Sequence, residues 1–494
     1  MDINLLGEIV GTLKYHLESK ANTYVGRKLI IKRLKDNNTE ISMQDINLAM
    51  QDFISGLDES EAGLCYSNNV FYFKDIQEAE DELRDYMETT SLKPSVSIDC
   101  SEAIKVVMNQ IKKEKKIEFT VQQEKAVHNA CNNRFSIITG GPGTGKTTII
   151  EAIVSAWSKN AEVRIWAPTG KASMRIGEAT GYYACTIHRG LMEEGMVGGL
   201  LIIDEASMID TYLMGQILRY NRDNNIVLIG DADQIPSIGA GDVLFDLLHI
   251  KGVLVTRLDQ GFRSDSTIIK NSKLLLKKTK LAELDYDESF LFINLKQKTI
   301  DAELTESDKR KLIKAKAEKI QQEVYKLWNY MLQQCQDIKG VIILVPLRKE
   351  DEETGKYVTV DTINRYIQKK RFHETGTKKI GSYYIKDRVI YNKNRYDIKP
   401  LNKNMDGELY NGMLGTVIAA DKSSGMQVEF DNGAIFMLAA SDGNITLAYA
   451  LTVHKAQGSE FKRVLFVSDN TTYSDRNLFY TAITRAKEQV IMVG

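Results

Sequence analysis

Short apolar runs that each end in a turn alternate with helical patterns through the middle of this chain. Four of them, between residues 135 and 236, read "FSIITGGPG", "VRIWAPTG", "LLIIDEAS" and "IVLIGDADQIP". Runs that are apolar at every position are typical of strands buried on both faces, in a parallel sheet covered by helices. Proline ends strands, and Pro142, Pro168 and Pro236 follow such runs. We therefore predict an α/β domain over residues 104–265.

The first 103 residues have a different pattern. Helical periodicity covers Leu5–Ser19 and Gly26–Lys35, and a charged helix is expected at Ile76–Met87. Between them, Gly63–Asp75 has two apolar and aromatic runs around Ser-Asn-Asn, which is typical of a β-hairpin. We predict a small helical, winged-helix-like domain over residues 1–103.

Beyond residue 265 the α/β pattern is interrupted once. A helical stretch at Ala302–Gln336 leads to the apolar strand "GVIILVP", and "RVLFVS" and "EQVIMVG" restore the pattern near the end. Between them, residues 379–446 contain short strands separated by glycine and asparagine turns, as in a small β-barrel. We predict a second α/β domain over 266–378 and 447–494, with a β-barrel inserted at 379–446.

Composition narrows the function classes. Sixty-five basic and 66 acidic side chains give a net charge of −1, so any nucleic-acid binding must be local. The five cysteines show no paired metal-ligand spacing, which favours a reduced, intracellular chain. The start "MDINLLGEIV" has no basic leader, and no apolar run approaches the roughly 18–20 residues that span a membrane. We expect a cytoplasmic protein, in the host cytoplasm if the source is viral.

The segment "GGPGTGKT" at 140–147 carries the clearest chemistry. It matches G-x-x-x-x-G-K-[ST] between an apolar strand and a helix, which is the context of a phosphate-binding loop. An ordinary glycine turn is the alternative, but it does not require this context. Lys146 would reach the β- and γ-phosphates and Thr147 would ligate Mg²⁺. The predicted nucleotide-binding residues here are Gly141, Pro142, Gly143, Thr144, Gly145, Lys146, Thr147 and Thr148.

Four further residues are candidates for the same site. Asp204 and Glu205 end the strand "LLIID"; they could simply cap the next helix, but beside a phosphate-binding loop Asp204 fits a Mg²⁺ ligand and Glu205 a general base. Gln234 is placed to sense the γ-phosphate, or is a satisfied loop amide. Gln123 completes a capping box with Thr120, and its amide is also a candidate for reading the adenine edge.

Nine blocks in order resemble the superfamily 1 helicases of the RecD-like group, the family of the exonuclease V alpha subunit. They cover residues 119–494 and read "FTVQQEKAV", "GGPGTGKTT", "APTGKASMRI", "TIHRGL", "LIIDEAS", "LIGDADQIPSIGAGDVL", "RLDQGFR", "LTVHKAQGSEF" and "YTAITRAKEQVIMVG". The resemblance implies two RecA-like domains, an SH3-like insertion in the second, ATP with Mg²⁺ between the domains, and 5′-to-3′ translocation on single-stranded DNA.

The same resemblance assigns roles to individual residues. Arg263 and Arg485 match the family's two arginine fingers, and Gln457, Gly458 and Glu460 match the block that links the nucleotide to DNA. Residues matching positions near the DNA backbone are Thr169, Gly170, Lys171, Thr186, His188, Thr452, His454 and Lys455. Tyr182, Tyr183, Phe262 and Tyr449 are candidates for base stacking, although aromatic residues are more often buried.

One segment departs from the family pattern. A duplex-splitting hairpin usually lies between the "TIHR" and "DEAS" blocks, but here only the ten residues 190–199 separate Arg189 from Leu200. We expect a pin that is minimal or supplied elsewhere. Three functions stay open: a helicase acting on single-stranded, forked or tailed DNA; a translocase that works with a nuclease, single-strand-binding or replisome partner; and an ATP-gated DNA-binding scaffold. No membrane partner is expected.

Overall fold

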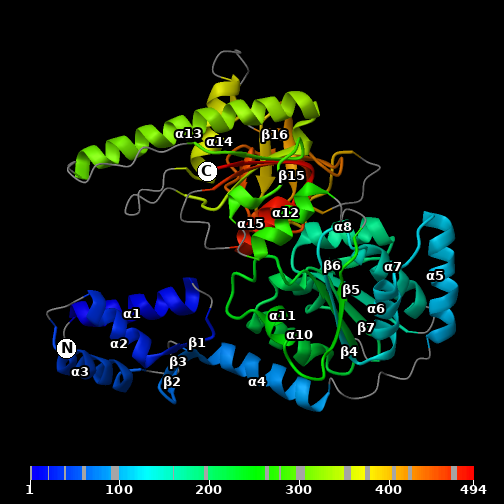
Figure 1. Cartoon of the computed structure of the whole chain (residues 1–494), viewed down its shortest axis with the longest axis horizontal. Helices are drawn as coiled ribbons and strands as arrows, with labels where there is room; N and C mark the ends of the chain where they lie inside the picture. The colour runs from blue at the N-terminus through cyan, green and yellow to red at the C-terminus, as the bar shows by residue number, and fades with distance from the viewer. Residues whose placement is uncertain are drawn as a thin grey trace. The chain divides into compact units, whose positions relative to one another are not determined.

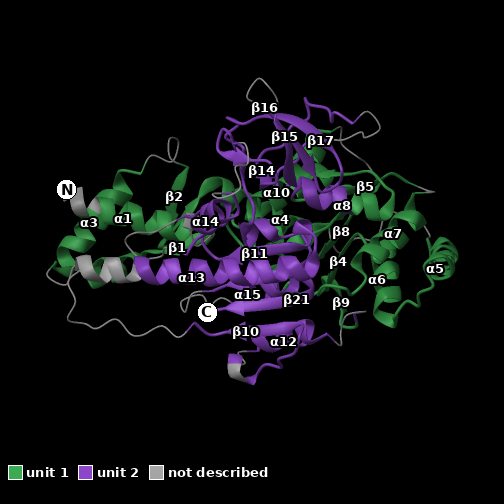
Figure 2. Ribbon diagram, turned by 90° about the horizontal axis from the view of Figure 1, so that it is seen from above, with its two compact units in different colours: residues 1–168, 176–232, 236–260 green, residues 169–175, 233–235, 261–494 purple. Residues whose placement is uncertain are grey.

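The computed structural model divides the chain into two compact units (Figures 1 and 2). The first contains residues 1–168, 176–232 and 236–260, and the second contains residues 169–175, 233–235 and 261–494. The residues that the structure describes are 3–19, 22–37, 41–57, 63–90, 100–158, 161–193, 198–261, 266–277, 280–295, 306–349, 358–372, 379–402, 408–420, 425–468 and 476–494. The predicted boundaries of the smaller domains stay predictions.

The first unit begins with a small module of three helices and a three-stranded antiparallel sheet. Its elements are α1 (Ile3–Lys14), β1 (Tyr24–Gly26), α2 (Arg27–Asn37), α3 (Met43–Ser55), β2 (Leu64–Ser67) and β3 (Val70–Phe73), with sheet order β1-β3-β2. The expected hairpin is present: β2 and β3 are joined by Asn68 and Asn69, both at positive φ, where asparagine is among the best tolerated residues. Ile9, Ile30, Ile46 and Phe71 form the centre of its core.

A six-stranded parallel sheet forms the rest of the first unit. Its order is β6-β5-β7-β8-β4-β9. The strands are β4 (Phe135–Gly140), β5 (Val163–Ala167), β6 (Ala184–Thr186), β7 (Leu200–Ile203), β8 (Asn225–Gly230) and β9 (Leu254–Leu258). All of its strand pairs are parallel, which confirms the α/β prediction for this region.

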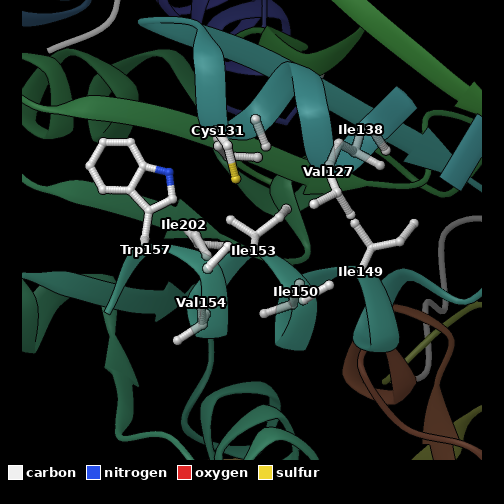
Figure 3. Packing of buried hydrophobic residues seen from close by; sticks show 14 of the residues in the cluster. Val127, Cys131, Ile138, Ile149, Ile150, Ile153, Val154, Trp157 and Ile202 are labelled. Atoms are coloured by element: carbon white, nitrogen blue, oxygen red, sulfur yellow. The ribbon is translucent and has the colours of Figure 1, made fainter. Parts of the chain in front are cut away.

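Helices cover both faces of this sheet. One face packs on α5 (Ser101–Lys115), α6 (Val121–Asn132) and α7 (Lys146–Trp157), and Figure 3 shows side chains of α6 and α7 in the same layer as Ile138 and Ile202 of the sheet. The opposite face packs on α10 (Thr211–Asn221), α11 (Val243–Leu247) and the end of α4 (Lys74–Thr89). The neighbouring residues Ile137 and Ile138 belong to different clusters, because successive strand residues point to opposite faces.

Helix α4 joins the amino-terminal module to the sheet by close packing against α10. Gly215 of α10 permits the approach, since a Cβ there would lie 2.7 Å from the Cβ and 2.8 Å from the Cα of Ala79. Arg222, just after α10, adds charged contacts: its Nη1 lies 2.7 Å from Glu82, and its Nη2 also pairs with Asp85. The module is therefore anchored to the sheet's helical layer through α4.

The second unit is built on a five-stranded parallel sheet of order β10-β21-β20-β11-β19. The strands are β10 (Phe290–Ile293), β11 (Val341–Val345), β19 (Ala450–Thr452), β20 (Phe461–Val467) and β21 (Ala486–Val493). Helices α12 (Thr267–Leu276) and α15 (Arg476–Thr484) cover one face. Helices α13 (Glu306–Cys335) and α14 (Val360–Phe372) cover the other. A second α/β core was predicted here, and the parallel sheet confirms it.

Between α14 and β19 the chain leaves this sheet and forms antiparallel strands. A two-stranded piece, β12 (Lys379–Ile380) with β13 (Tyr383–Tyr384), precedes a five-stranded sheet of order β17-β16-β15-β14-β18. Its strands are β14 (Arg388–Tyr391), β15 (Leu414–Ala420), β16 (Gly425–Phe430), β17 (Ile435–Ala439) and β18 (Ile445–Leu447). Its separate core includes Val389, Val417 and Phe436. Within the described part of the chain, no helix is long and apolar enough to cross a membrane.

The α4–α10 contact gives a test of the fold. Gly215→Ala places a methyl group against the backbone of Ala79, so we expect the helices to separate and lose about 1–3 kcal/mol of local stability. Hydrogen exchange should then become faster in both helices. Gly11→Ala on α1 is the matched control: its Cβ meets nothing within 4 Å, and helix propensity alone should stabilise α1 by about 0.5–1 kcal/mol. Equal protection of α4 and α10 in Gly215→Ala and in the unsubstituted chain would contradict this packing.

Candidate nucleotide and nucleic-acid sites

The loop between β4 and α7 has a backbone that requires glycine. Gly143 and Gly145 have φ values of 74° and 85°, a left-handed conformation that costs glycine little and other residues more. A Cβ at Gly140 would lie 2.8 Å from Leu258 Cβ and 2.9 Å from Thr144 Oγ1. The turn is thus closed tightly enough to direct successive N–H groups toward one place, which is how such loops hold phosphate oxygens.

Lys146 begins α7, and its ammonium lies over this loop. Its Nζ donates to the carbonyl oxygens of Gly140 at 2.5 Å and Gly141 at 3.2 Å. Thr144 Oγ1 also donates to Gly141 O, at 2.8 Å. Thr147 and Thr148 follow in the first turn of α7, where free N–H groups and the helix dipole favour an anion. The residues predicted from the motif therefore surround a single helix start.

Gln123 braces the loop from α6. Its Oε1 accepts from Thr120 N–H at 2.9 Å, while Gln123 N–H donates to Thr120 Oγ1 at 3.2 Å, which completes the predicted capping box. Its Nε2 donates to Thr144 O at 2.9 Å, and the side chain is buried. The amide thus ties the start of α6 to the loop. Reading of an adenine edge by Gln123 stays a prediction.

The acidic pair lies at the same edge of the sheet as the loop. Asp204 and Glu205 directly follow β7, and β7 and β4 are the two neighbours of β8. Because parallel strands end on one side, their carboxyl ends share that edge. Glu205 adopts a left-handed φ of 53°, an uncommon conformation for glutamate that often marks a functional position. One threonine hydroxyl and one carboxylate suit Mg²⁺, which is usually bound by few protein ligands together with nucleotide phosphates.

In the second unit, Arg485 is held between α15 and β21. Its side chain is 4% exposed. Nε donates to Thr481 O at 3.2 Å, and Nη1 donates to Ser459 O at 3.4 Å. Two backbone carbonyls therefore fix the orientation of a buried guanidinium.

The predicted residues Gln234 and Gln457 belong to the same cluster of the second unit. Gln457 Nε2 donates to Ile235 O at 3.0 Å, and Ile235 N–H donates to Thr481 Oγ1 at 2.9 Å. Asn477 Nδ2 donates to Gln234 O at 3.1 Å. Thr481 contacts both Ile235 and Arg485, so a single side chain and its backbone connect the "DQIP" segment to the arginine.

Glu460, in the loop after Gln457, forms two ion pairs. Its carboxylate pairs with Arg175 at 3.2 Å and with Lys487 at 3.1 Å. Arg175 also donates to Gly458 O at 3.4 Å, and Gly458 has a φ of 69°. The predicted pair of Gly458 and Glu460 is thus fixed by two cations from other blocks, Arg175 and Lys487.

The residues matched to a DNA backbone on the first turn of α8 (Gly170–Thr180) lie in the second unit. Thr169 Oγ1 accepts from Ala172 N–H at 3.2 Å and so caps the helix. A Cβ at Gly170 would lie 2.5 Å from the Tyr410 ring. Burial is the main reason why the pKa of Lys171 is lowered to about 8; Arg388 and Arg175 lower it further, and Asp431 opposes them.

Two other predicted DNA-side residues belong to the first unit. Thr186 ends β6 and caps the short helix α9 (Ile187–Gly190), with Oγ1 accepting from Arg189 N–H at 3.2 Å. His188 is exposed on that helix. Both follow the carboxyl end of a strand of the parallel sheet, as the acidic pair does.

Thr452 and Lys455 line a cavity of about 520 Å³ in the second unit, bounded by α14, β12–β13, β18 and β19, which we call the α14 groove. His454 starts the short helical turn His454–Ala456, which contains Lys455. Lys455 Nζ donates to Asn392, and burial together with Arg348 lowers the pKa of Lys455. Three further cations line the groove: Arg348, Arg365 and Lys379. Sequence reasoning missed these three, because they lie 14 or more residues apart in the chain and only the fold assembles them.

Some predicted features fall outside the described residues or in a core. Arg263, Phe262 and residues 194–197 of the expected pin lie outside the described residues. Tyr449 is buried, and its hydroxyl donates to Asp387 Oδ1 at 2.6 Å, so it belongs to a core and is not a stacking surface. Tyr183, by contrast, is 65% exposed.

Two domain families match this chain. The profile described as an AAA domain matches residues 118–293, and the one described as a UvrD-like helicase C-terminal domain matches residues 447–493. Among solved structures, a Pif1 helicase from Bacteroides in complex with ADP-AlF3 and ssDNA is 17% identical, with a TM-score of 0.45, over 76% of this chain and 92% of that one.

Two curated relatives each match about three quarters of this chain. The chain is 29% identical over 401 residues to the ATP-dependent RecD2 DNA helicase of Deinococcus radiodurans, over 76% of this chain and 48% of the relative. It is 27% identical over 430 residues to the RecBCD enzyme subunit RecD of Mycolicibacterium smegmatis, over 76% of this chain and 70% of that protein. It therefore spans about half the length of the first relative. By these two domain matches and these relatives, the chain is similar to the RecD-like superfamily 1 helicases.

Proposed function

We propose that this chain is an ATP-dependent DNA helicase that moves 5′-to-3′ along a single strand and uses groups from both units to hydrolyse ATP. The observation that carries the proposal is the glycine-dependent turn from β4 into α7, which presents N–H groups and Lys146 to a polyphosphate. The relatives named RecD2 and RecD support DNA as the substrate.

Each residue of the site then has a chemical task. Lys146 leaves the loop carbonyls to meet the β- and γ-phosphates, and Thr147 with Asp204 would hold Mg²⁺. The ion would neutralise phosphate charge. Glu205 orients and deprotonates the attacking water, and Gln234 responds to the γ-phosphate. Arg485 and Arg263 stabilise the charge that builds on the transferring group. Gln457 and Glu460 relay the state of the nucleotide to the strand.

The α14 groove is the proposed path of the strand over the second unit. Its cavity of about 520 Å³ is lined by four cations and one carboxylate, Asp361. The cations are Arg348, Arg365, Lys379 and Lys455. Such an excess of positive charge suits a phosphate backbone. Thr452 supplies a neutral hydroxyl at the same wall. The other proposed contacts to the DNA backbone lie on loops that follow strand ends. They are Thr169, Gly170, Lys171, Thr186 and His188.

The proposal includes three finer features: the type of the amino-terminal module, the type of the inserted sheet, and the domain limits. We infer that the amino-terminal module is winged-helix-like, since its elements run helix, strand, helix, helix, strand, strand. The antiparallel sheet between α14 and β19 would be the SH3-like insertion. The domain limits then fall near residues 103, 265, 378 and 446, and the chain works in the cytoplasm.

A translocase that needs a partner for strand separation is the second candidate. The observation that favours it is the short segment from Gly190 to Gly199, which leaves little chain for a duplex-splitting pin. A nuclease or single-strand-binding partner would then supply what the segment lacks. A scaffold without hydrolysis is disfavoured because Lys146, Asp204, Glu205 and Arg485 are all present.

Substrate polarity separates these functions. ATP hydrolysis by the chain should rise at least tenfold with single-stranded DNA, and forked DNA with a 5′ tail should be unwound while DNA with only a 3′ tail is not. Both are measured with labelled duplexes and a phosphate-release assay. Stimulated hydrolysis without unwinding would select the translocase. An ATP hydrolysis rate that does not change when single-stranded DNA is added would refute both the helicase and the translocase.

Arg485 can be tested apart from nucleotide binding. Arg485→Ala removes a guanidinium from the reacting phosphoryl group, so kcat should fall by about 10³-fold or more while the Kd for ATP changes less than about threefold. Arg485→Lys keeps a positive charge but loses the planar guanidinium, so its kcat should fall nearly as far. Lys462→Ala, at an exposed position of β20, is the control. Turnover near that of the control, in a variant with an unchanged circular dichroism spectrum, would refute the assignment.

Lys171 predicts a dependence of DNA affinity on pH. Its pKa is lowered to about 8, so the ammonium is charged below that pH and becomes neutral as the pH rises through it. If it contacts a DNA phosphate, affinity for a single strand should drop about fivefold between about pH 7 and about pH 9. Lys171→Arg keeps its charge throughout that range, and its affinity should stay level. The same drop in both proteins would show that Lys171 is not the cause.

A further inference from the structure

Positive charge is concentrated on one helix of the amino-terminal module. Helix α2, "RKLIIKRLKDN", carries five cations and one carboxylate, Asp36. Helix α3 carries Asp45 and Asp52 and no lysine or arginine. Helix α4, "KDIQEAEDELRDYMET", is also mainly acidic. A solvated helix in a protein of net charge −1 normally mixes both signs, so this segregation needs a physical reason.

The cations of α2 lie on the side away from the core. Ile30 and Leu34 are buried in the core that α1, α2 and α3 share, and these helices lie together in Figure 1. Lys28 and Lys32 are four residues apart and exposed, and residues at this spacing lie on the same face of a helix. Neither makes an ion pair or hydrogen bond with the part of the chain that the structure describes. Among the described residues, their charge therefore has no counter-ion.

The surface around α2 includes a stacked guanidinium. Arg33 lies 4.5 Å from the centroid of the Tyr15 ring, and its Nη1 is 3.5 Å from His16 Nε2. Arg27 Nη2 donates to Asn47 Oδ1 at 3.4 Å, and Lys35 Nζ donates to Ile41 O at 2.7 Å. These contacts hold the cations in place on the module. We call Lys28, Lys32 and Arg33 the α2 basic face.

We propose that the α2 basic face binds the phosphate backbone of duplex DNA without reading its sequence. A duplex carries one charge per about 1.7 Å of its axis, which is the polyanion that unpaired lysines on a rigid helix suit best. Single-strand sites usually add several stacking aromatics. Here Arg33 covers one side of the Tyr15 ring, which leaves Tyr24, three residues before α2, as an exposed aromatic residue beside this surface. In a helix-turn-helix pair the second helix reads bases, and here that helix, α3, is acidic.

This surface acts separately from the ATP site. It would hold the duplex region of a tailed substrate while the motor acts on the single strand. Since it requires only unpaired cations on α2, it does not depend on whether the chain unwinds DNA alone.

A blunt duplex of about 20 base pairs tests the proposal, because it offers the motor no single strand. Fluorescence anisotropy with the full chain should detect binding that the double variant Lys28→Glu/Lys32→Glu weakens at least tenfold at low salt. The slope of log K against log salt should become shallower by about 2, at roughly 0.9 per lost phosphate contact. The matched control is Lys105→Glu/Lys113→Glu on α5, at two exposed positions with the same charge change; its affinity should fall less than twofold.

Three outcomes overturn the proposal: no binding of blunt duplex by the unsubstituted chain, equal losses in the two double variants, or a loss seen with single-stranded but not with duplex DNA. Circular dichroism and thermal melting show that the variants are folded. ATP hydrolysis stimulated by single-stranded DNA should stay within twofold in the α2 variant, which separates this test from failure of the motor proposal.

Discussion

The turn from β4 into α7 is the constraint on which the rest of this structure depends. A polyphosphate is held by backbone N–H groups only where the chain reverses tightly enough to aim several of them at one point. Here that reversal needs left-handed φ values at Gly143 and Gly145 and no Cβ at Gly140. Gln123 then fixes the loop from α6 through Thr144 O. The buried parallel sheet positions this turn at the carboxyl end of β4. It brings the carboxyl end of β7, which Asp204 and Glu205 follow, to the same edge of the sheet.

In the second unit, the comparable constraint is the burial of Arg485. A guanidinium that is 4% exposed must be satisfied by acceptors, and Thr481 O and Ser459 O supply two. Thr481 also accepts from Ile235 N–H, and Gln457 holds Ile235 O. A displacement of the "DQIP" segment therefore acts on the residue that orients the arginine. This gives a physical route by which Gln234, the proposed nucleotide sensor, and Arg485, the proposed catalytic cation, would respond together.

Much of this could be predicted from sequence, and the limits follow from physics. The buried strands show as apolar runs, and the phosphate loop shows as glycines at fixed spacing, because both depend on local chemistry. Three cations of the α14 groove could not be predicted in this way. Arg348, Arg365 and Lys379 converge only after α14 and the β12–β13 hairpin fold together. Tyr449 looked available for stacking, but burial against Asp387 was decided by tertiary packing. The excess of lysine and arginine on α2 is visible in the sequence. Only the structure shows which face of α2 is buried and therefore which of these cations are exposed.

The central claim is that Arg485 acts on the same γ-phosphate as the β4–α7 loop. The most direct measurement compares the affinity of ADP with that of ADP plus aluminium fluoride, a mimic of the transferring phosphoryl group, in the unsubstituted chain and in Arg485→Ala. The account predicts that the variant binds ADP within about threefold of the unsubstituted chain but loses about 100-fold or more of the extra affinity that the fluoride complex provides. Equal affinity for the fluoride complex in both proteins would contradict it.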